Sequence, residues 1–108
     1  MIDRELLKGS TALLILSLLH REGRLYGYQI SKLIQERSEH VLSYKDGTLY
    51  PALYKLEEDG LIQSEWSEAN GRKRKYYDIT SGGRGELRNK EEEWKLYMRS
   101  MGSVLGYD

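Results

Sequence analysis

The sequence predicts an α+β fold, mostly α-helical, in which a winged helix-turn-helix is followed by a long C-terminal helix. Residues 46–79 have the pattern of a helix, a strand, a turn with four consecutive cations and a second strand. Two helical segments precede this unit, and an apolar stripe at helical spacing follows it in residues 87–105. This order of elements is typical of a winged helix.

Composition excludes several classes of protein. The chain of 108 residues fits a single core without metals or disulfides, and the absence of cysteine excludes a thiolate zinc site and a cysteine nucleophile. His20 and His40 lie in different segments without a nearby ligand set, and no nucleophile elbow, P-loop or pair of carboxylates is present. We therefore expect no enzyme, no metal and no cofactor.

No segment predicts export or insertion into a membrane. The longest apolar run, residues 12–19, is far shorter than the roughly 20 residues that a membrane-spanning helix needs. No small-residue cleavage site follows it, as a signal peptide would require. We expect a cytoplasmic protein without a membrane partner.

The first two helices are predicted from their apolar patterns. Residues 4–21 are rich in leucine and apolar almost all round at 12–19, which predicts a buried helix whose neighbours could include a second subunit. Gly23 ends it, and a second helix is expected from Tyr26, with Ile30 and Ile34 on its apolar face. Residues 41–44 are β-leaning and predict a short strand that leads into the third helix.

The third helix has recognisable start and stop signals. Asp46 and Thr48 are both capable N-caps, Pro51 is expected in the first turn, where its missing N–H has no consequence, and Gly60 ends the helix. Helical periodicity assigns Leu49, Ala52, Leu53 and Leu56 to the core side, and Tyr50, Pro51, Tyr54, Lys55 and Glu58 to the outer side. Tyrosine hydroxyls and a lysine that point into a groove can bind phosphates and base edges of DNA.

A β-ribbon is predicted from residues 61–66 and 75–79, joined by a loop in which Asn70-Gly71 is a strong turn pair. The cations lie at the tip and directly after it. Residues 41–70 hold two cations and six carboxylates, whereas residues 71–80 hold four cations and Asp78 alone. The net charge of zero therefore conceals one local cationic patch that can bind several phosphates.

The C-terminal part of the chain predicts a dimerisation helix. Residues 81–85, Ser-Gly-Gly-Arg-Gly, are expected to form a loose junction, with the helix beginning near Arg84. Its apolar set follows spacings of three, four and seven: Leu87, Trp94, Tyr97, Met98, Met101, Val104 and Leu105. Such a stripe needs a partner, and a sister chain would supply a second reading helix for a second half-site. We therefore divide the chain into a DNA-binding domain, residues 1–80, and a dimerisation helix, residues 81–108.

Several segments together resemble the PadR family of bacterial transcriptional regulators, in its short form with one C-terminal dimerisation helix. They are YGYQI (26–30), GTLYPALYKLEEDGLI (47–62), EW (65–66), GRKRKYYDIT (71–80), GR (83–84) and Trp94. The resemblance covers nearly the whole chain. It implies a homodimeric repressor that binds an inverted repeat in double-stranded DNA and is released by a small aromatic or hydrophobic ligand.

The resemblance also implies roles for individual residues. The DNA-binding residues would be Tyr50, Tyr54 and Lys55 in the recognition helix and Gly71, Arg72, Lys73 and Arg74 in the wing. The ligand would stack on Trp94 in a pore at the dimer interface, beside Leu6, Gly9, Leu13 and Met98. Drug-responsive relatives can have an acidic residue where this chain has Met98, so the slot implied here is apolar.

An alternative interpretation belongs to a different class of function. Net neutrality and the exposed aromatic residues also suit a small-molecule-binding or protein-interaction dimer whose winged helix does not read DNA specifically. In that case we expect ligand quenching of Trp94 fluorescence without sequence-selective retention of DNA.

Overall fold

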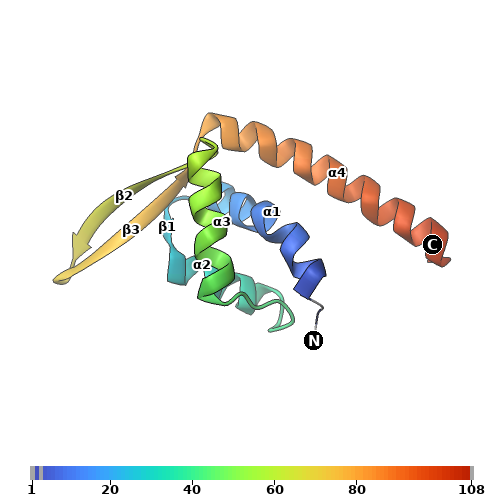
Figure 1. The fold of residues 1–108 in the computed structure, drawn as a ribbon, viewed down its shortest axis with the longest axis horizontal. Helices are drawn as coiled ribbons and strands as arrows, with labels where there is room; N and C mark the ends of the chain where they lie inside the picture. Colours follow the sequence, from blue (N-terminus) through green and yellow to red (C-terminus); the bar gives the residue numbers. More distant parts are fainter. Residues whose placement is uncertain (1, 3, 108) are drawn as a thin grey trace.

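The computed structural model describes Ile2 and residues 4–107, which form a three-helix body, a β-hairpin and a long terminal helix. In chain order the elements are α1 Arg4–Glu22, β1 Leu25–Tyr26, α2 Gly27–Arg37, α3 Asp46–Glu58, β2 Ile62–Ala69, β3 Arg72–Ile79 and α4 Ser81–Leu105. The hairpin and α4 extend from opposite sides of the body (Figure 1), in a molecule that measures 54 × 30 × 21 Å. The predicted fold class is confirmed.

The core lies where α1, α2 and α3 meet the base of the hairpin. Its fully buried side chains are Ile15, Leu16, Leu19, Ile30, Leu49, Leu53 and Ile62. The expectation that α1 is buried almost all round holds for its second half, whereas Leu13 and Leu14 are only half-buried. These two leucines face the side on which α4 passes the body.

The sheet contains a strand that the sequence did not predict. β1 adds to the hairpin in the order β1-β3-β2, with Leu25 opposite Tyr77 and Tyr26 opposite Tyr76, all antiparallel. The strand expected at residues 41–44 is wrong. These residues pair with no strand in the described part of the chain. The Leu42 N–H instead donates to Ser38 Oγ at 2.9 Å, and the Tyr44 hydroxyl donates to the Leu7 carbonyl at 2.8 Å.

The start of α3 differs from the prediction, and its end agrees. Lys45 occupies the N-cap position without a side-chain cap, and its carbonyl accepts from the N–H groups of Thr48 and Leu49 at 2.9 Å. Asp46 and Thr48 are therefore helical residues rather than caps, and Pro51 lies in the second turn instead of the first. Gly60 takes a positive φ of 76° directly after the helix, as a C-terminal glycine does.

The prediction of a loose glycine-rich junction at residues 81–85 is wrong, because these residues form the first turn of α4. Thr80 caps this turn by accepting from the Gly83 N–H at 3.0 Å, while its own hydroxyl donates to the Gly60 carbonyl at 2.7 Å. A Cβ on Gly83 would collide with the Leu61 carbonyl oxygen and lie 2.7 Å from Ile79 Cγ1. Close packing against Leu61 and Ile79, rather than a need for a flexible chain, therefore accounts for glycine at position 83.

Helices of the described residues are all too short or too polar to cross a membrane.

Candidate functional site

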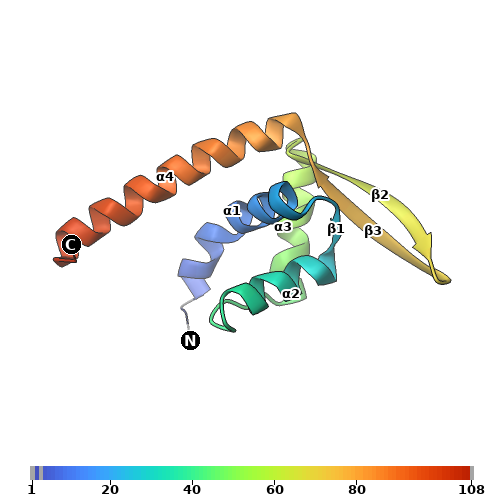
Figure 2. The ribbon, with the colours of Figure 1, turned by 180° about the vertical axis from the view of Figure 1, so that it is seen from behind.

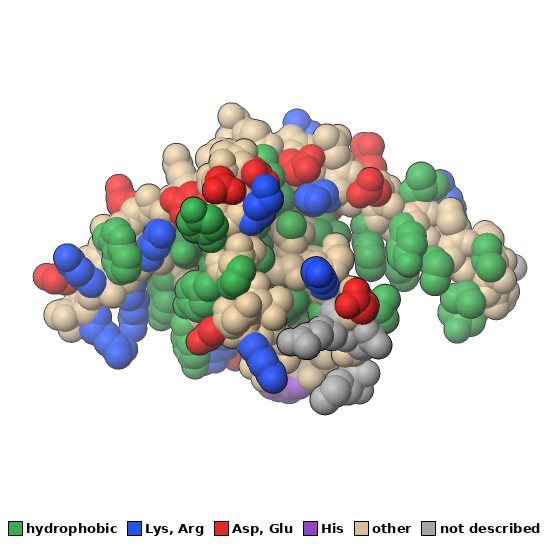
Figure 3. Space-filling model, viewed as in Figure 1, with side chains coloured by type: hydrophobic (Ala, Val, Ile, Leu, Met, Phe, Trp, Pro, Cys, Tyr) green, Lys and Arg blue, Asp and Glu red, His purple; other side chains and the backbone are tan. Residues whose placement is uncertain are grey.

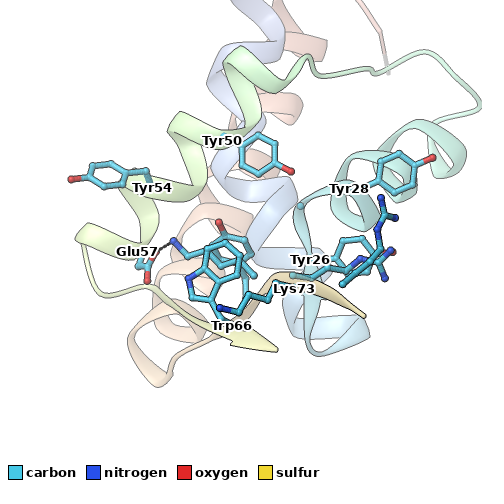
Figure 4. Close-up of a pocket in the computed structure, with 12 residues that line it drawn as sticks. Tyr26, Tyr28, Tyr50, Tyr54, Glu57, Trp66 and Lys73 are labelled. Carbon is cyan, nitrogen blue, oxygen red and sulfur yellow. Dashed lines mark ion pairs between the residues drawn. The ribbon is translucent and has the colours of Figure 1, made fainter. Parts of the chain in front are cut away.

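A groove of about 770 Å³ opens between α3, the start of α2 and the hairpin (Figure 4). Its lining combines aromatic rings with the cations of β3 and one carboxylate. The lining residues are Tyr26, Gly27, Tyr28, Tyr50, Tyr54, Glu57, Trp66, Arg72, Lys73, Arg74, Lys75 and Tyr77. The groove is thus shaped and charged to receive a polyanion with flat, stackable groups.

Helix α3 presents the predicted outer face to this groove. Leu49, Leu53 and Leu56 are buried, and this orientation leaves Tyr50 44% and Tyr54 67% exposed. Lys55 is also exposed but does not line the groove. Its ammonium donates to Asp59 Oδ1 at 3.1 Å, and this bond together with the charge of Asp59 raises the pKa of Lys55 above its usual value.

Tyr50 is held in place by the first residue of α2. A Cβ added to Gly27 would lie 2.7 Å from two ring carbons of Tyr50 and would collide with its hydroxyl. The ring therefore occupies the space that any other residue at position 27 would fill. This contact connects α3 to the start of α2.

The hairpin is longer than predicted, and its turn is as predicted. Asn70 and Gly71 take positive φ values of 52° and 75°, as a tight hairpin turn requires. The cations begin directly after this turn, but they lie inside β3 rather than in a loop. Because side chains alternate along a strand, Lys73 shares one face with Lys75, whereas Arg72 and Arg74 start from the other face.

The four cations of β3 have different surroundings. The Arg74 guanidinium lies 4.4 Å above the Tyr26 ring, and the Lys75 ammonium lies 3.6 Å from Glu57 Oε1. Arg72 and Lys73 have no ion-pair partner within the part of the chain that the structure describes. These two side chains near the tip, and Arg74, which stacks on Tyr26 but has no ion-pair partner among the described residues, are left available for an external anion.

Glu57 contacts both strands of the hairpin. Besides its ion pair with Lys75, it accepts a hydrogen bond from Ser64 Oγ on β2. Burial raises the pKa of Tyr77 above its usual value, and the nearby negative charge of Glu57 raises it further. Glu57 is therefore the point at which α3, β2 and β3 meet.

Two predicted DNA-binding residues lie apart from the groove, and four of its aromatic residues, one of them the buried Tyr77, were not predicted. Lys55 is on the outer side of α3, and Gly71 forms the turn, so neither lines it. Tyr26, Tyr28 and Trp66 line the groove, and Tyr28 and Trp66 are each 63% exposed. The signal that could have found them is the presence of large aromatic residues at chain positions where a core would not bury them.

The five residues predicted to bind a ligand lie around one second cavity, of about 640 Å³. Leu6, Gly9 and Leu13 line it from α1, and Trp94 and Met98 line it from α4. Tyr97 adds a second ring, with its centroid 5.9 Å from that of Trp94. The structure thus brings this set together within a single chain, and its role in binding stays a prediction.

Several apolar side chains of α4, including ones that line this cavity, are not covered by the described chain. Trp94, Met98 and Leu105 are 42%, 51% and 55% exposed, and the buried residues of α4 are Gly83 and Leu87 near its start. Figure 3 shows hydrophobic side chains along the protruding helix and Lys and Arg side chains at the hairpin end. Among the described residues no group of His, Asp and Glu could hold a metal ion.

Comparisons with known proteins agree with this arrangement. A family model described as the transcriptional regulator PadR-like family matches residues 15–89. A transcriptional regulator from Clostridium thermocellum has a TM-score of 0.87 and 37% identity, over 95% of this chain and 97% of that chain. A transcriptional regulator from Mycobacterium tuberculosis is 47% identical over 55 residues, which are 51% of each protein.

One similar structure contains DNA. Bacillus subtilis PadR in complex with operator DNA has a TM-score of 0.65 and 33% identity, over 72% of this chain and 44% of that chain. The region that is similar to this DNA-bound protein covers most of the present chain.

Proposed function

Because the chain belongs to the PadR-like family of transcriptional regulators, we propose that it is a homodimeric repressor that binds an inverted-repeat operator in double-stranded DNA. The observation that carries this proposal is the groove in which the exposed tyrosines of α3 face the free cations of β3. A helix and a basic hairpin on one surface can bind a major groove and the adjacent backbone together. The family membership agrees with the expectation that the protein is not an enzyme.

Within this proposal each predicted residue has a defined task. Tyr50 and Tyr54 contact base edges and phosphates from α3, and Arg72, Lys73 and Arg74 bind the backbone from the wing. Lys55 contacts phosphates from the rim, after exchange of its bond to Asp59 for one to DNA. Gly71 supports the wing through the shape of its turn.

Dimerisation is assigned to α4. The helix continues past the body of the molecule (Figure 2), and its exposed apolar side chains there form a stripe that a second copy can cover. We retain residues 1–80 as the DNA-binding domain and residues 81–108 as the dimerisation helix, with the first turn of α4 packed onto the domain through Gly83. Two copies then present two α3 helices to two half-sites.

Release from DNA is assigned to a small aromatic or hydrophobic effector in the cavity between α1 and α4. Trp94 and Tyr97 offer flat surfaces for stacking, and Leu6, Gly9, Leu13 and Met98 add an apolar part of a wall that Glu5 also lines. An effector acts only if it prefers one dimer geometry over another. The effector would therefore favour a spacing of the two α3 helices that does not fit the operator.

The test of DNA reading is recovery of sheared host DNA on the immobilised protein at low and near-physiological salt, followed by sequencing. Enrichment of an inverted repeat that survives the higher salt supports a sequence-reading dimer. Uniform retention that disappears at the higher salt means phosphate binding alone, because that component depends steeply on salt. The latter result would contradict the proposed operator.

The cavity of α1 and α4 also favours a second candidate, a ligand-binding or protein-interaction dimer that does not read DNA. Its test is fluorescence of Trp94 in a Trp66→Phe background, since the chain holds two tryptophans. Quenching by aromatic compounds without selective DNA recovery supports this candidate. Quenching together with selective recovery supports the ligand-responsive repressor.

A further inference from the structure

Glu57 is an acidic residue on a surface proposed to bind phosphates. It lines the same groove as Arg72, Lys73 and Arg74. A carboxylate in that position weakens attraction of DNA, because like charges repel and fewer counterions are released. Its presence there calls for a role other than contact with DNA.

The contacts of Glu57 point to such a role. One carboxylate oxygen accepts from Ser64 Oγ on β2. The other lies 3.6 Å from Lys75 Nζ on β3, the ion pair dashed in Figure 4. Ser64 pairs with Tyr77 and Trp66 pairs with Lys75, so Ser64 and Lys75 are diagonal neighbours on one face of the hairpin. A single side chain of α3 therefore binds both strands at once.

Lys75 is committed to this contact rather than to an external anion. Its ammonium also lies 5.8 Å from the centre of the ring of Tyr77, a core residue. Glu57 and Lys75 have side chains only 33% and 37% exposed, so solvent screens the pair less than a fully exposed one. Of the four cations in β3, Lys75 belongs to the base of the wing.

The outer wing has few other connections to the body. Within the described residues, β1 pairs with β3 at Tyr76 and Tyr77 alone, and beyond these positions the two strands of the hairpin pair only with each other. A two-stranded ribbon is marginally stable alone and twists readily. The direction of its outer part therefore depends on a few contacts: those of its base with α3 through Glu57, the Arg24–Glu65 ion pair at 3.1 Å, and the stacking of Arg74 on Tyr26.

We propose that Glu57 is a positioning residue that fixes the angle between α3 and the wing, so that both contact one DNA site together. The inference rests on the proposed DNA binding and extends it to a residue that does not touch DNA. Loss of the contact leaves each element able to bind DNA but no longer in a shared register. Selectivity for one sequence then falls more than binding to DNA in general.

The DNA experiment compares Glu57→Gln with Glu58→Gln, which removes the same charge from an exposed neighbour that does not line the groove. Binding is measured on the duplex recovered from host DNA and on a shuffled duplex of equal length. We expect Glu57→Gln to lower affinity for the recovered duplex about fivefold to tenfold, from loss of a charged hydrogen bond and an ion pair, without weakening the shuffled one. Glu58→Gln should raise both affinities slightly.

A charge swap tests whether the ion pair itself is responsible. Glu57→Lys combined with Lys75→Glu restores opposite charges between α3 and β3 at unchanged net charge. The double variant should recover most of the sequence selectivity that Glu57→Lys and Lys75→Glu each lose alone. Equal increases of both affinities in Glu57→Gln, as in Glu58→Gln, would overturn the inference, because Glu57 would then act only as a repelling charge.

A second measurement does not use DNA. Backbone ¹⁵N order parameters of residues 66–74 in the free protein should fall in Glu57→Gln and stay unchanged in Glu58→Gln. Unchanged order in Glu57→Gln overturns the inference even if DNA is read. If the wild-type protein selects no sequence, the proposed function fails, whereas reduced order in the variant would still support the contact that holds the wing.

Discussion

Tyr50 and Tyr54 are neighbours on one face of α3 but are held differently. Tyr50 rests against Gly27, so its direction is set by α2, whereas Tyr54 is 67% exposed and has more freedom. A side chain held before binding loses less conformational entropy when it contacts DNA. At the scale of single residues, Tyr50 is therefore the better candidate for a contact that depends on geometry.

Tyr77 gives a prediction about alkaline stability. Burial raises its pKa above the ordinary value of 10.0, so the folded protein holds the phenol proton more tightly than the unfolded chain does. The stabilisation is fully present below about pH 10 and is lost as pH rises through the folded pKa. Tyr77→Phe should therefore lose less stability than the wild type between pH 9 and about 11, as measured by urea unfolding.

Tyr76 supplies the control, since it lies beside Tyr77 on β3 but is only half-buried. Tyr76→Phe removes a phenol hydroxyl from the same strand and keeps the ring that contacts Tyr26 and Arg24, so it controls for the substitution itself. Identical alkaline slopes for Tyr77→Phe and the wild type would contradict the assigned cause.

The wing is the element in which position along a strand separates similar side chains. Lys75 lies at the base and binds Glu57, while Arg72 and Lys73 lie near the tip without ion-pair partners among the described residues. A run of four cations in the sequence therefore becomes two functional groups in the fold. The outer group is the one expected to meet phosphates.

Replacement of Arg72, Lys73 and Arg74 by alanine should weaken binding to every DNA sequence. Each lost phosphate contact lowers the slope of log affinity against log salt by about 0.9, so the triple variant should lose up to about 2.7. Filter binding or fluorescence anisotropy from low to moderate salt measures the slope. An unchanged slope would rule out phosphate contacts by these side chains.

The first turn of α4 gives a prediction about stability. A Cβ at Gly83 would collide with the Leu61 carbonyl, so Gly83→Ala should destabilise the protein by about 1–3 kcal/mol through overpacking. Gly85 lies in the same helix with nothing within 4 Å of an added Cβ. Gly85→Ala should therefore stabilise by about 0.5–1 kcal/mol.

Urea unfolding of both glycine variants measures the difference. Opposite signs would support close packing at Gly83. A stabilising Gly83→Ala would mean that the junction adapts at little cost, in agreement with the looser chain that the glycine run suggested.

At the scale of the whole molecule, α4 and the wing extend in opposite directions (Figures 1 and 2). One end carries cations and the other carries an uncovered apolar stripe. This separation allows a dimer to form through α4 without obstruction of the groove. In the proposed dimer, the cavity beside Trp94 would lie next to the interface formed by α4.

Leu105→Lys tests the assigned dimer interface. Leu105 is 55% exposed in one chain, so lysine there costs the monomer little, whereas burial against a second copy leaves an unpaired ammonium. We expect the dimer dissociation constant to rise by about 100-fold, since burial of an unpaired charge costs several kcal/mol. Sedimentation equilibrium measures it.

Ser103→Lys is the matched control, because two residues along a helix change direction by about 200°. It adds the same charge on the side of α4 away from Leu105 and should leave the dimer intact. A dimer that survives Leu105→Lys would exclude this end of the stripe from the interface.

Periodicity and turn chemistry were enough to predict most of the elements. The core face of α3, the Asn70-Gly71 turn and the stop at Gly60 follow from local rules, since burial spacing and positive φ are properties of short segments. The outer face of α3 and the cations after the turn, which supply much of the groove, could be found in the same way. The resemblance of the motifs led to the correct family.

Tertiary contacts settled the features that local rules got wrong. β1 forms at residues 25–26 rather than 41–44 because β3 offers a free edge there, and residues 81–85 become helix because Thr80 caps them and Gly83 packs on Leu61. Tyr26, Tyr28 and Trp66 join the groove, and Glu57 joins Lys75, only when separate segments meet. The sequence alone therefore determined where the main helices and the hairpin lie along the chain, because helix and turn formation depends on residues that are close in sequence. The tertiary structure determined which residues share a surface, because such a surface is formed by residues that are distant in sequence.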